Sequence, residues 1–267
     1  LRTERGRAMR KLSENLDAWE AYQRGLWHMS NGEMAENELA QVFFQRAIDL
    51  DPSFAAGHGA LAWSHMMAAS IFSRMPIDEG CLVAEPLLRR ATTLDENDLE
   101  ARARLAIAAL LRGDFEGAFD NAQQVLAVKG TCAEALGVKG AVLVYSGRGE
   151  EGRAAIRQHL TLSRNDPARP IRLSQLALSL YLDGDYQDAA NLARQVVRQY
   201  PRHPVAYRWL AAALGQLGRI AEAEEVLEHL RTTAPSSLDM YIRQRPAYCS
   251  IEHAPLLAGL RKAGWKE

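Results

Sequence analysis

The stretch Leu176–Pro201 reads LALSLYLDGDYQDAANLARQVVRQYP and holds two amphipathic helical segments joined at Gly184. Small residues at Ala177, Ala189 and Ala193 stand on either side of the glycine among larger apolar residues at helical spacing. The closing proline ends the second segment, because proline disfavours helix in the residue before it. The stretch therefore predicts one structural unit, a helix, a tight turn and a second helix.

The same unit recurs along the chain. Gly113, Gly147, Gly184 and Gly218 hold the turn position and are 34, 37 and 34 residues apart. A period of about 34 residues with two helices in each period is typical of tetratricopeptide repeats, which the region Ala101–Pro235 resembles. We therefore expect an all-α fold, a right-handed superhelix of antiparallel helix pairs with about six repeats and a C-terminal capping element.

Three regions are expected along the chain. Residues 1–14 are interpreted as a basic linker from an upstream domain, because Leu1 to Lys11 carries five basic residues and one acidic residue. Residues 15–235 form the repeat array, whose first helix is capped by Asn15 or Asp17. Pro86 is expected to kink its helix or delay the start of that helix. Residues 236–267 form the cap, with helices near Leu238–Gln244 and Ile251–Ala263.

Composition narrows the possible partners and the compartment. A net charge of −1 gives no field that would attract nucleic acid or an anionic membrane, so neither is an expected partner. Cys81, Cys132 and Cys249 are odd in number and far apart, which favours a reducing compartment, and we expect the cytoplasm. The apolar stretch from Gly59 to Phe72 is too short to span a bilayer and predicts a core helix.

Two sequence patterns resemble those of ligand-binding sites, one for a dinucleotide and one for zinc. Gly147–Gly152 satisfies the G-x-G-x-x-G pattern of dinucleotide-binding loops, but Gly147 holds the repeat's turn position, and no strand–helix series surrounds it. His58 and His65 share a helix face without the further ligands that zinc needs. No residue type pairs as nucleophile and base. We expect no catalytic residue, no metal and no cofactor.

The predicted binding site is the concave face, which the first helix of each repeat lines in such arrays. Large aromatic, apolar and arginine side chains at those positions have the composition of interface cores. The candidates are Trp63, Met67, Arg104, Ile107, Tyr145, Tyr181, Arg208 and Trp209. Two alternatives stay open: the groove accepts a protein or peptide segment, or neighbouring helices or the chain's own upstream segment cover it.

A receptor for chaperone tails is not expected. Co-chaperones that resemble this array hold a carboxylate terminus with a clamp of lysine, asparagine and arginine. The corresponding positions carry other residue types here: Ala103, Ile107, Val138, Ile171 and Gln175.

Two short stretches carry a narrower resemblance. Glu14–Gly25 (ENLDAWEAYQRG) and Leu260–Trp265 (LRKAGW) resemble the C-terminal repeat region of multidomain bacterial adenylate cyclases of class III. The resemblance implies a cyclase domain upstream, and similar regions also follow winged-helix regulators. We therefore expect a non-catalytic interaction and regulatory module of a bacterial signalling protein; self-association is the alternative. An enzyme built on helical repeats would need convergent titratable groups, and the sequence shows none.

Overall fold

The computed structural model describes residues 17–164, 166–239, 247–249, 251 and 253–266. Every regular element in these residues is a helix. The elements are a helical segment over residues 17–30, α2 (Met34–Leu50), α3 (Ala55–Ser70), α4 (Ile77–Leu94), α5 (Leu99–Leu111), α6 (Phe115–Val128), α7 (Ala133–Tyr145), α8 (Gly149–Leu162), α9 (Arg169–Leu182), α10 (Tyr186–Gln199), α11 (Pro204–Gln216), α12 (Ile220–Thr233), α13 (Pro235–Asp239), the 3₁₀ turn η2 (Ala247–Cys249) and α14 (His253–Lys262).

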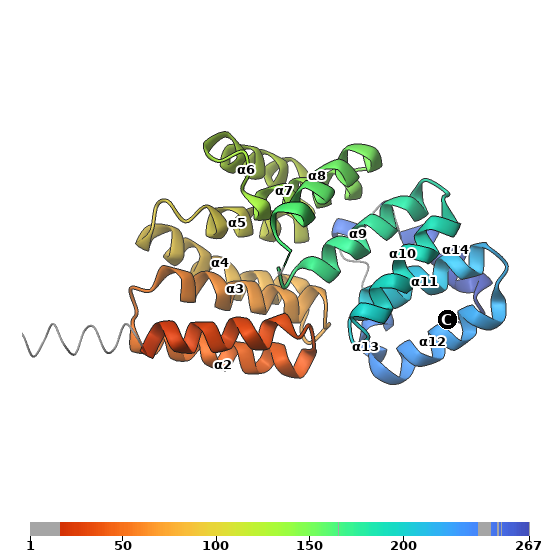
Figure 1. Cartoon of the computed structure of the whole chain (residues 1–267), viewed down its shortest axis with the longest axis horizontal. Coiled ribbons are helices and arrows are strands. Elements are labelled where there is room, and N and C mark those ends of the chain that lie inside the picture. Colours follow the sequence, from red (N-terminus) through yellow and green to blue (C-terminus); the bar gives the residue numbers. More distant parts are fainter. Residues whose placement is uncertain (1–16, 165, 240–246, 250, 252, 267) are drawn as a thin grey trace, which may run out of the picture.

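The helices pack as successive hairpins along a curve (Figure 1). Each of α3, α5, α7 and α9 packs against the helix that follows it, and also against the first helix of the next hairpin. The last of these first helices, α11, packs against α12 and α14. The first helices therefore form one continuous inner layer, and the second helices form the outer layer. The predicted all-α superhelix of helix pairs is confirmed.

Glycine makes the turn inside each regular hairpin. Gly113, Gly147, Gly184 and Gly218 have φ between 72° and 88°, the left-handed region that costs glycine little. At Gly184 the turn closes with hydrogen bonds from Gly184 N to Tyr181 O and from Asp185 N to Leu180 O. This pairing satisfies the last carbonyl groups of α9 and reverses the chain into α10.

The two helices of a hairpin approach closely where both carry small residues. A Cβ atom built on Gly140 of α7 would lie 3.0 Å from the carbonyl oxygen of Gly152 of α8. The reciprocal distance, from a Cβ built on Gly152 to the carbonyl oxygen of Gly140, is 2.9 Å. Neither position has room for a side chain, which agrees with the predicted role of small residues at the hairpin contact.

In the second hairpin, one of the two effects expected of Pro86 is absent. Helix α4 begins at Ile77 and continues through Pro86 to Leu94, so Pro86 does not delay its start. Pro86 lies on the exposed side of the helix, where water can satisfy the carbonyl group that loses its donor. The extra length of this hairpin lies in its longer helices and in the connection between Ser70 and Ile77.

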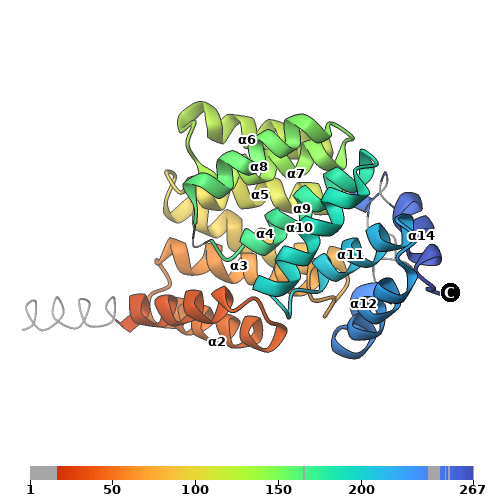
Figure 2. The ribbon, with the colours of Figure 1, turned by 45° about the vertical axis from the view of Figure 1, so that its right-hand side comes forward.

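The array curls far enough for distant hairpins to meet. Arg202, in the turn between α10 and α11, forms an ion pair with Glu33, the residue before α2. In Figure 2 this turn approaches the hairpin that contains α2. The inner surface is therefore curved and partly enclosed. None of the helices in the described ranges has the length and apolar character needed to cross a membrane.

The C-terminal region folds back onto the array. Helix α14 packs against α11, and the predicted helix over Ile251–Ala263 is thus present with slightly shorter bounds. A Cβ built on Gly215 would lie 2.2 Å from the carbonyl oxygen of Gly259, so two glycines permit this contact. The predicted linker over residues 1–14, the Asn15 cap and most of the predicted helix Leu238–Gln244 lie outside the described residues.

Candidate peptide-binding groove

An open groove of about 1170 Å³ lies along one edge of the inner layer. Its walls are the helical segment over residues 17–30, the beginning of α3, and the connections that precede α5, α7 and α9. Tyr22, Leu26, Met29 and Trp63 provide an apolar side. The groove is thus bounded by successive repeats.

Charged side chains line the groove as well. Five lining residues are acidic and three are basic, so carboxylates predominate. They are Asp95, Asp98, Glu100, Glu134 and Asp166, with Arg104, Lys129 and Arg164. Several of these carboxylates also order the local backbone; the Asp98 side chain, for example, accepts a hydrogen bond of 2.9 Å from Ala101 N at the start of α5.

Glu134 is the least satisfied of these carboxylates. Its side chain is 10% exposed, and its Oε1 atom has no hydrogen-bond donor among the described residues. The Nη2 atom of Arg172 lies 3.7 Å from Oε1. Burial, reinforced by the charge of Asp166, raises the pKa of Glu134 to about 6, although Arg172 and Arg104 oppose the shift. Burial is the largest cause, so the raised pKa of Glu134 reflects mainly the lost hydration of its carboxylate.

Two arginines are held beside Glu134 by close contact with glycines. A Cβ on Gly137 would lie 2.6 Å from Nε of Arg172, and one on Gly59 would lie 3.3 Å from Nη1 of Arg104. Burial alone lowers the pKa of Arg104, but the charges of Glu134 and Glu100 outweigh it and raise the pKa above its ordinary value. This direction indicates that negative charge predominates in the immediate surroundings of Arg104.

The structure divides the eight predicted groove residues into two groups. Trp63 and Arg104 line the open groove. The other six are buried or half-buried in the inner layer: Met67, Ile107, Tyr145, Tyr181, Arg208 and Trp209. Their contact with a partner remains a prediction.

The chain's own C-terminal residues cover part of the second group. The Tyr181 hydroxyl donates a hydrogen bond of 2.7 Å to the carbonyl oxygen of Pro255. The rings of Tyr145 and Tyr248 meet edge to face with centroids 5.2 Å apart. Only about 30 Å³ of free space remains beside Tyr145, Trp209 and Tyr248. This part of the inner surface is therefore filled by neighbouring helices and by the chain's own C-terminal residues.

Sequence reasoning missed most of the open groove. Glu134 and Asp166 lie near the connections between hairpins, and Tyr22 and Met29 lie on the first helical segment. A charged residue at a repeat junction is ordinarily solvated, so the sequence offers no sign that Glu134 is buried. The curl of the array places the connections that carry Glu134 and Asp166 beside the first hairpin, so that these residues line the same groove as Tyr22 and Met29.

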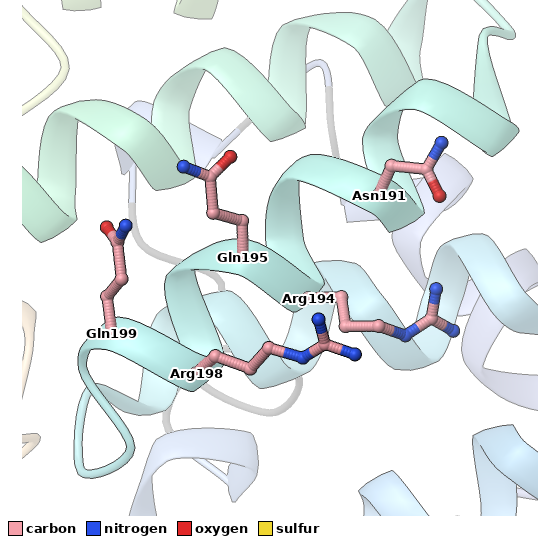
Figure 3. A pocket seen from close by; sticks show the side chains of 5 residues that line it. All are labelled: Asn191, Arg194, Gln195, Arg198 and Gln199. Carbon is pink, nitrogen blue, oxygen red and sulfur yellow. The ribbon is translucent and has the colours of Figure 1, made fainter.

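A second hollow, of about 400 Å³, lies on the outer layer (Figure 3). All five side chains that line it come from α10, and Figure 3 shows them fanning out along one face of the helix. They are Asn191, Arg194, Gln195, Arg198 and Gln199. Arg194 pairs with Glu222 of α12 at 3.2 Å. With no second wall, the hollow is the polar face of α10 and not a binding site.

The structure explains both the glycine pattern at Gly147 and the histidine at position 58 without a ligand. Gly147, with φ 79°, is the turn between α7 and α8, and the apolar run before it is helical. A nitrogen of the His58 ring lies 3.1 Å from the carbonyl oxygen of Pro52. Across the described part of the chain, no three His, Cys, Asp or Glu side chains are grouped to hold a metal ion.

Comparison with known proteins identifies the repeat type over part of the chain. Residues 180–241 match the family model described as tetratricopeptide repeat. No curated protein matches the chain. Among solved structures, pilF of Pseudomonas aeruginosa is 19% identical, with 90% of this chain and 98% of that chain covered and a TM-score of 0.47.

Two structures of MamA are similar as well. One is 15% identical, with 61% of this chain and 93% of that chain covered and a TM-score of 0.46. The other is 14% identical, with 68% and 95% covered and a TM-score of 0.44. The hairpin geometry, the glycine turns and the match over residues 180–241 together describe a tetratricopeptide-type helical repeat protein.

Proposed function

We propose that this chain is a non-catalytic interaction module that binds an extended segment of a partner protein in the open groove. The observation that carries the proposal is the groove itself, with an apolar side at Trp63 and a charged side at Arg104 and Glu134. Its volume of about 1170 Å³ exceeds the roughly 300–1,000 Å³ of ordinary small-molecule pockets. An open channel that crosses several repeats suits a peptide better than a metabolite.

The chemistry of the groove favours binding over catalysis. Cys132 lines it, but burial raises the pKa of this thiol, which keeps it in the unreactive protonated form. Glu134, the most perturbed carboxyl in the lining, is flanked by arginines and not by a nucleophile.

We further propose that the module belongs to a larger bacterial signalling protein of the cytoplasm and follows an adenylate cyclase domain. The support is the resemblance of Glu14–Gly25 and Leu260–Trp265 to the repeat region of class III cyclases. The module would then bring a regulatory partner to the upstream effector. The reading frame upstream of Leu1 tests this part directly: the absence of a cyclase domain from that frame would overturn it.

Site-specific photocrosslinking tests the binding site. Thr131 is exposed and lines the groove, whereas Leu82 is 71% exposed on α4 and does not line it. A photoreactive amino acid at Thr131 is expected to crosslink a partner protein in cells, and the same amino acid at Leu82 is not. Equal crosslinking from both positions would contradict the groove as the site, and crosslinks only between copies of this chain would indicate self-association instead.

A further inference from the structure

The first hairpin of the array, which ends in α2, has an apolar outer face. The Trp27 ring meets the His28 ring edge to face with centroids 4.8 Å apart, and the His28 ring stacks on Phe43 of α2 at 5.1 Å. Leu39 lies one turn before Phe43 on the same face of α2, and Val42 lies three residues after Leu39. Trp27, Leu39 and Val42 are 62%, 44% and 64% exposed. The four apolar side chains Trp27, Leu39, Val42 and Phe43 are called the end patch.

The opposite face of this hairpin holds it to the rest of the array. Phe44 is fully buried, with its ring centroid 5.9 Å from that of Tyr22, and Tyr22 also meets Phe54, the residue before α3, at 5.2 Å. In Figure 1 the hairpin forms one end of the array, and none of the described helices lies beyond it. A repeat at the end of a solenoid ordinarily presents a polar outer face. An exposed apolar face at this place therefore indicates a surface that another protein surface covers.

The charges around the end patch are balanced. Arg24 pairs with Glu20 at 2.6 Å on the first helical segment. Further along α2, Arg46 and Asp49 place one charge of each sign beyond Val42. The end patch therefore has no excess charge that would select a charged ligand, and two copies of it can meet without net repulsion.

The other end of the array has a different surface. The exposed positions of α12 are mainly charged and include Glu225, Glu228 and Arg231. Head-to-tail stacking would press the end patch against such side chains and would remove their charges from water without partners. A two-fold contact between two end patches instead buries apolar surface on both sides and closes the assembly at two copies.

The size of the face suits a stable dimer. The two helices of the hairpin are about 21 Å and 26 Å long and together about 20 Å wide, so the face covers roughly 450 Å² in projection. Side chains corrugate a helix surface, so the accessible area exceeds the projection and reaches the range of stable dimers, about 600–1,000 Å² on each copy.

The chain's own residues 1–16 match the end patch less well than a second copy does. They include five basic residues and two acidic ones. The carboxylate of Glu20 is already paired with Arg24, so a basic segment would gain few ion pairs at this face.

We propose that two copies of this chain associate end to end through the end patch, around a two-fold axis. The four side chains of the end patch are separate from those that line the open groove, so the dimer presents two grooves and the inference is independent of the proposed function.

Sedimentation of the full chain over a range of concentrations tests this inference. The mass is expected to rise from that of one chain, 29.6 kDa, to twice that value and no further. Val42→Glu places a charge in the contact and should weaken association at least about tenfold. The matched control is Val128→Glu, at the end of α6, where the side chain is 71% exposed and outside the end patch; it should dimerise like the unaltered protein.

Two further measurements guard against a folding defect. Trp27→Gln removes apolar surface from an exposed position without adding a charge, so it should melt like the unaltered protein and still weaken association. Hydrogen exchange of the unaltered protein needs no substitution: α2 should exchange more slowly at high than at low protein concentration, and α6 should exchange equally at both.

Three results would overturn the inference. The first is a single-chain mass at every concentration, including the case in which the chain dimerises only after residues 1–16 are deleted, because the chain's own segment then covers the patch. The second is a dimer that neither Val42→Glu nor Trp27→Gln weakens and whose formation leaves exchange in α2 unchanged. The third is a series of masses beyond two copies, which would indicate head-to-tail stacking.

Discussion

The hydroxyl group of Tyr181, on α9, donates a hydrogen bond of 2.7 Å to the carbonyl oxygen of Pro255, which lies 74 residues further along the chain. The same hydroxyl accepts a bond of 3.1 Å from Nε2 of Gln216 on α11. One side chain thus joins two inner-layer helices to the C-terminal segment. Burial raises the pKa of Tyr181 to about 12, so the hydroxyl remains protonated and able to donate at any physiological pH.

Replacing Tyr181 with Phe should therefore destabilise the protein. The change leaves the Pro255 carbonyl oxygen without this donor, at a cost of about 1 kcal/mol, because a buried polar group without a partner loses its solvation. Chemical denaturation measures this cost. Tyr186→Phe is the control, since Tyr186 is partly exposed and water can solvate its hydroxyl; an equal loss in both variants would contradict the role of the Pro255 contact.

Gly259→Ala should displace the C-terminal helix from the array. A Cβ at this position would lie 2.4 Å from the Tyr181 hydroxyl and 2.7 Å from the carbonyl oxygen of Ala212. Overpacking of this kind costs about 1–3 kcal/mol. Hydrogen exchange measured by mass spectrometry should show faster exchange over residues 253–262, and Ala258→Ser, on the exposed side of α14, should leave exchange unchanged. Unchanged exchange in Gly259→Ala would show that the segment does not pack as described.

The hairpin contact of the fifth repeat supplies a matched pair of variants. Ala189 is fully buried between helices, whereas Gln187, two residues earlier on α10, is exposed. Ala189→Leu should reduce the free energy of unfolding by about 1–3 kcal/mol, because the added atoms have no space. Gln187→Leu should be nearly neutral. Equal melting temperatures for the two variants would contradict the tight contact at Ala189.

The pH dependence of stability should contain a contribution from His203. This side chain is 2% exposed, and burial, with the charge of Arg208 as a second cause, lowers its pKa to about 3 from an unfolded value near 6.5. The unfolded chain therefore binds a proton that the folded chain excludes. The stabilisation is complete above about pH 6.5 and is lost as the pH falls toward 3, by up to about 1.4 kcal/mol per pH unit.

Denaturation at several pH values between 7 and 4 measures this contribution. His203→Asn should show a shallower loss of stability on acidification, and His229→Asn, on the exposed face of α12, should follow the unaltered protein. Glu134 acts in the opposite direction: its pKa of about 6 means that the folded state takes up a proton first and gains stability as the pH falls below that value. The contribution of Glu134 is the same in the unaltered protein and in both variants. If the free energy of unfolding of His203→Asn changed with pH in parallel with that of the unaltered protein, the contribution assigned to His203 would be wrong.

Much of the fold was predictable from local signals. The positions of Gly113 and Gly184 predict turns because a left-handed backbone conformation is inexpensive only for glycine, and both residues adopt it. Gly140 and Gly152 indicate a close helix contact by their size alone. The effect of Pro86 on its helix was harder to predict from the sequence. The cost of a proline in a helix depends on whether the carbonyl group one turn earlier, which loses its hydrogen-bond donor, faces water, and the sequence does not reveal this.

The candidate site was less predictable, since only Trp63 and Arg104 of the expected residues line the open groove. The repeat register predicts which residues lie on the concave face. It does not predict which of these residues are covered by other segments of the chain. The C-terminal helix was expected as a cap, and the sequence contains no sign that Pro255 and Tyr248 would meet Tyr181 and Tyr145.

The sequence by itself determined the helices, their turns and their pairing, because helical periodicity, glycine conformation and proline geometry act between residues that are near one another in the chain. Only the tertiary structure decided which part of the inner surface stays open and that Glu134 is buried without a donor. Those properties depend on the curl of the whole array and on contacts such as Arg202 with Glu33, 169 residues apart. Small rotations between successive hairpins add up to that curl, and no single repeat encodes their sum.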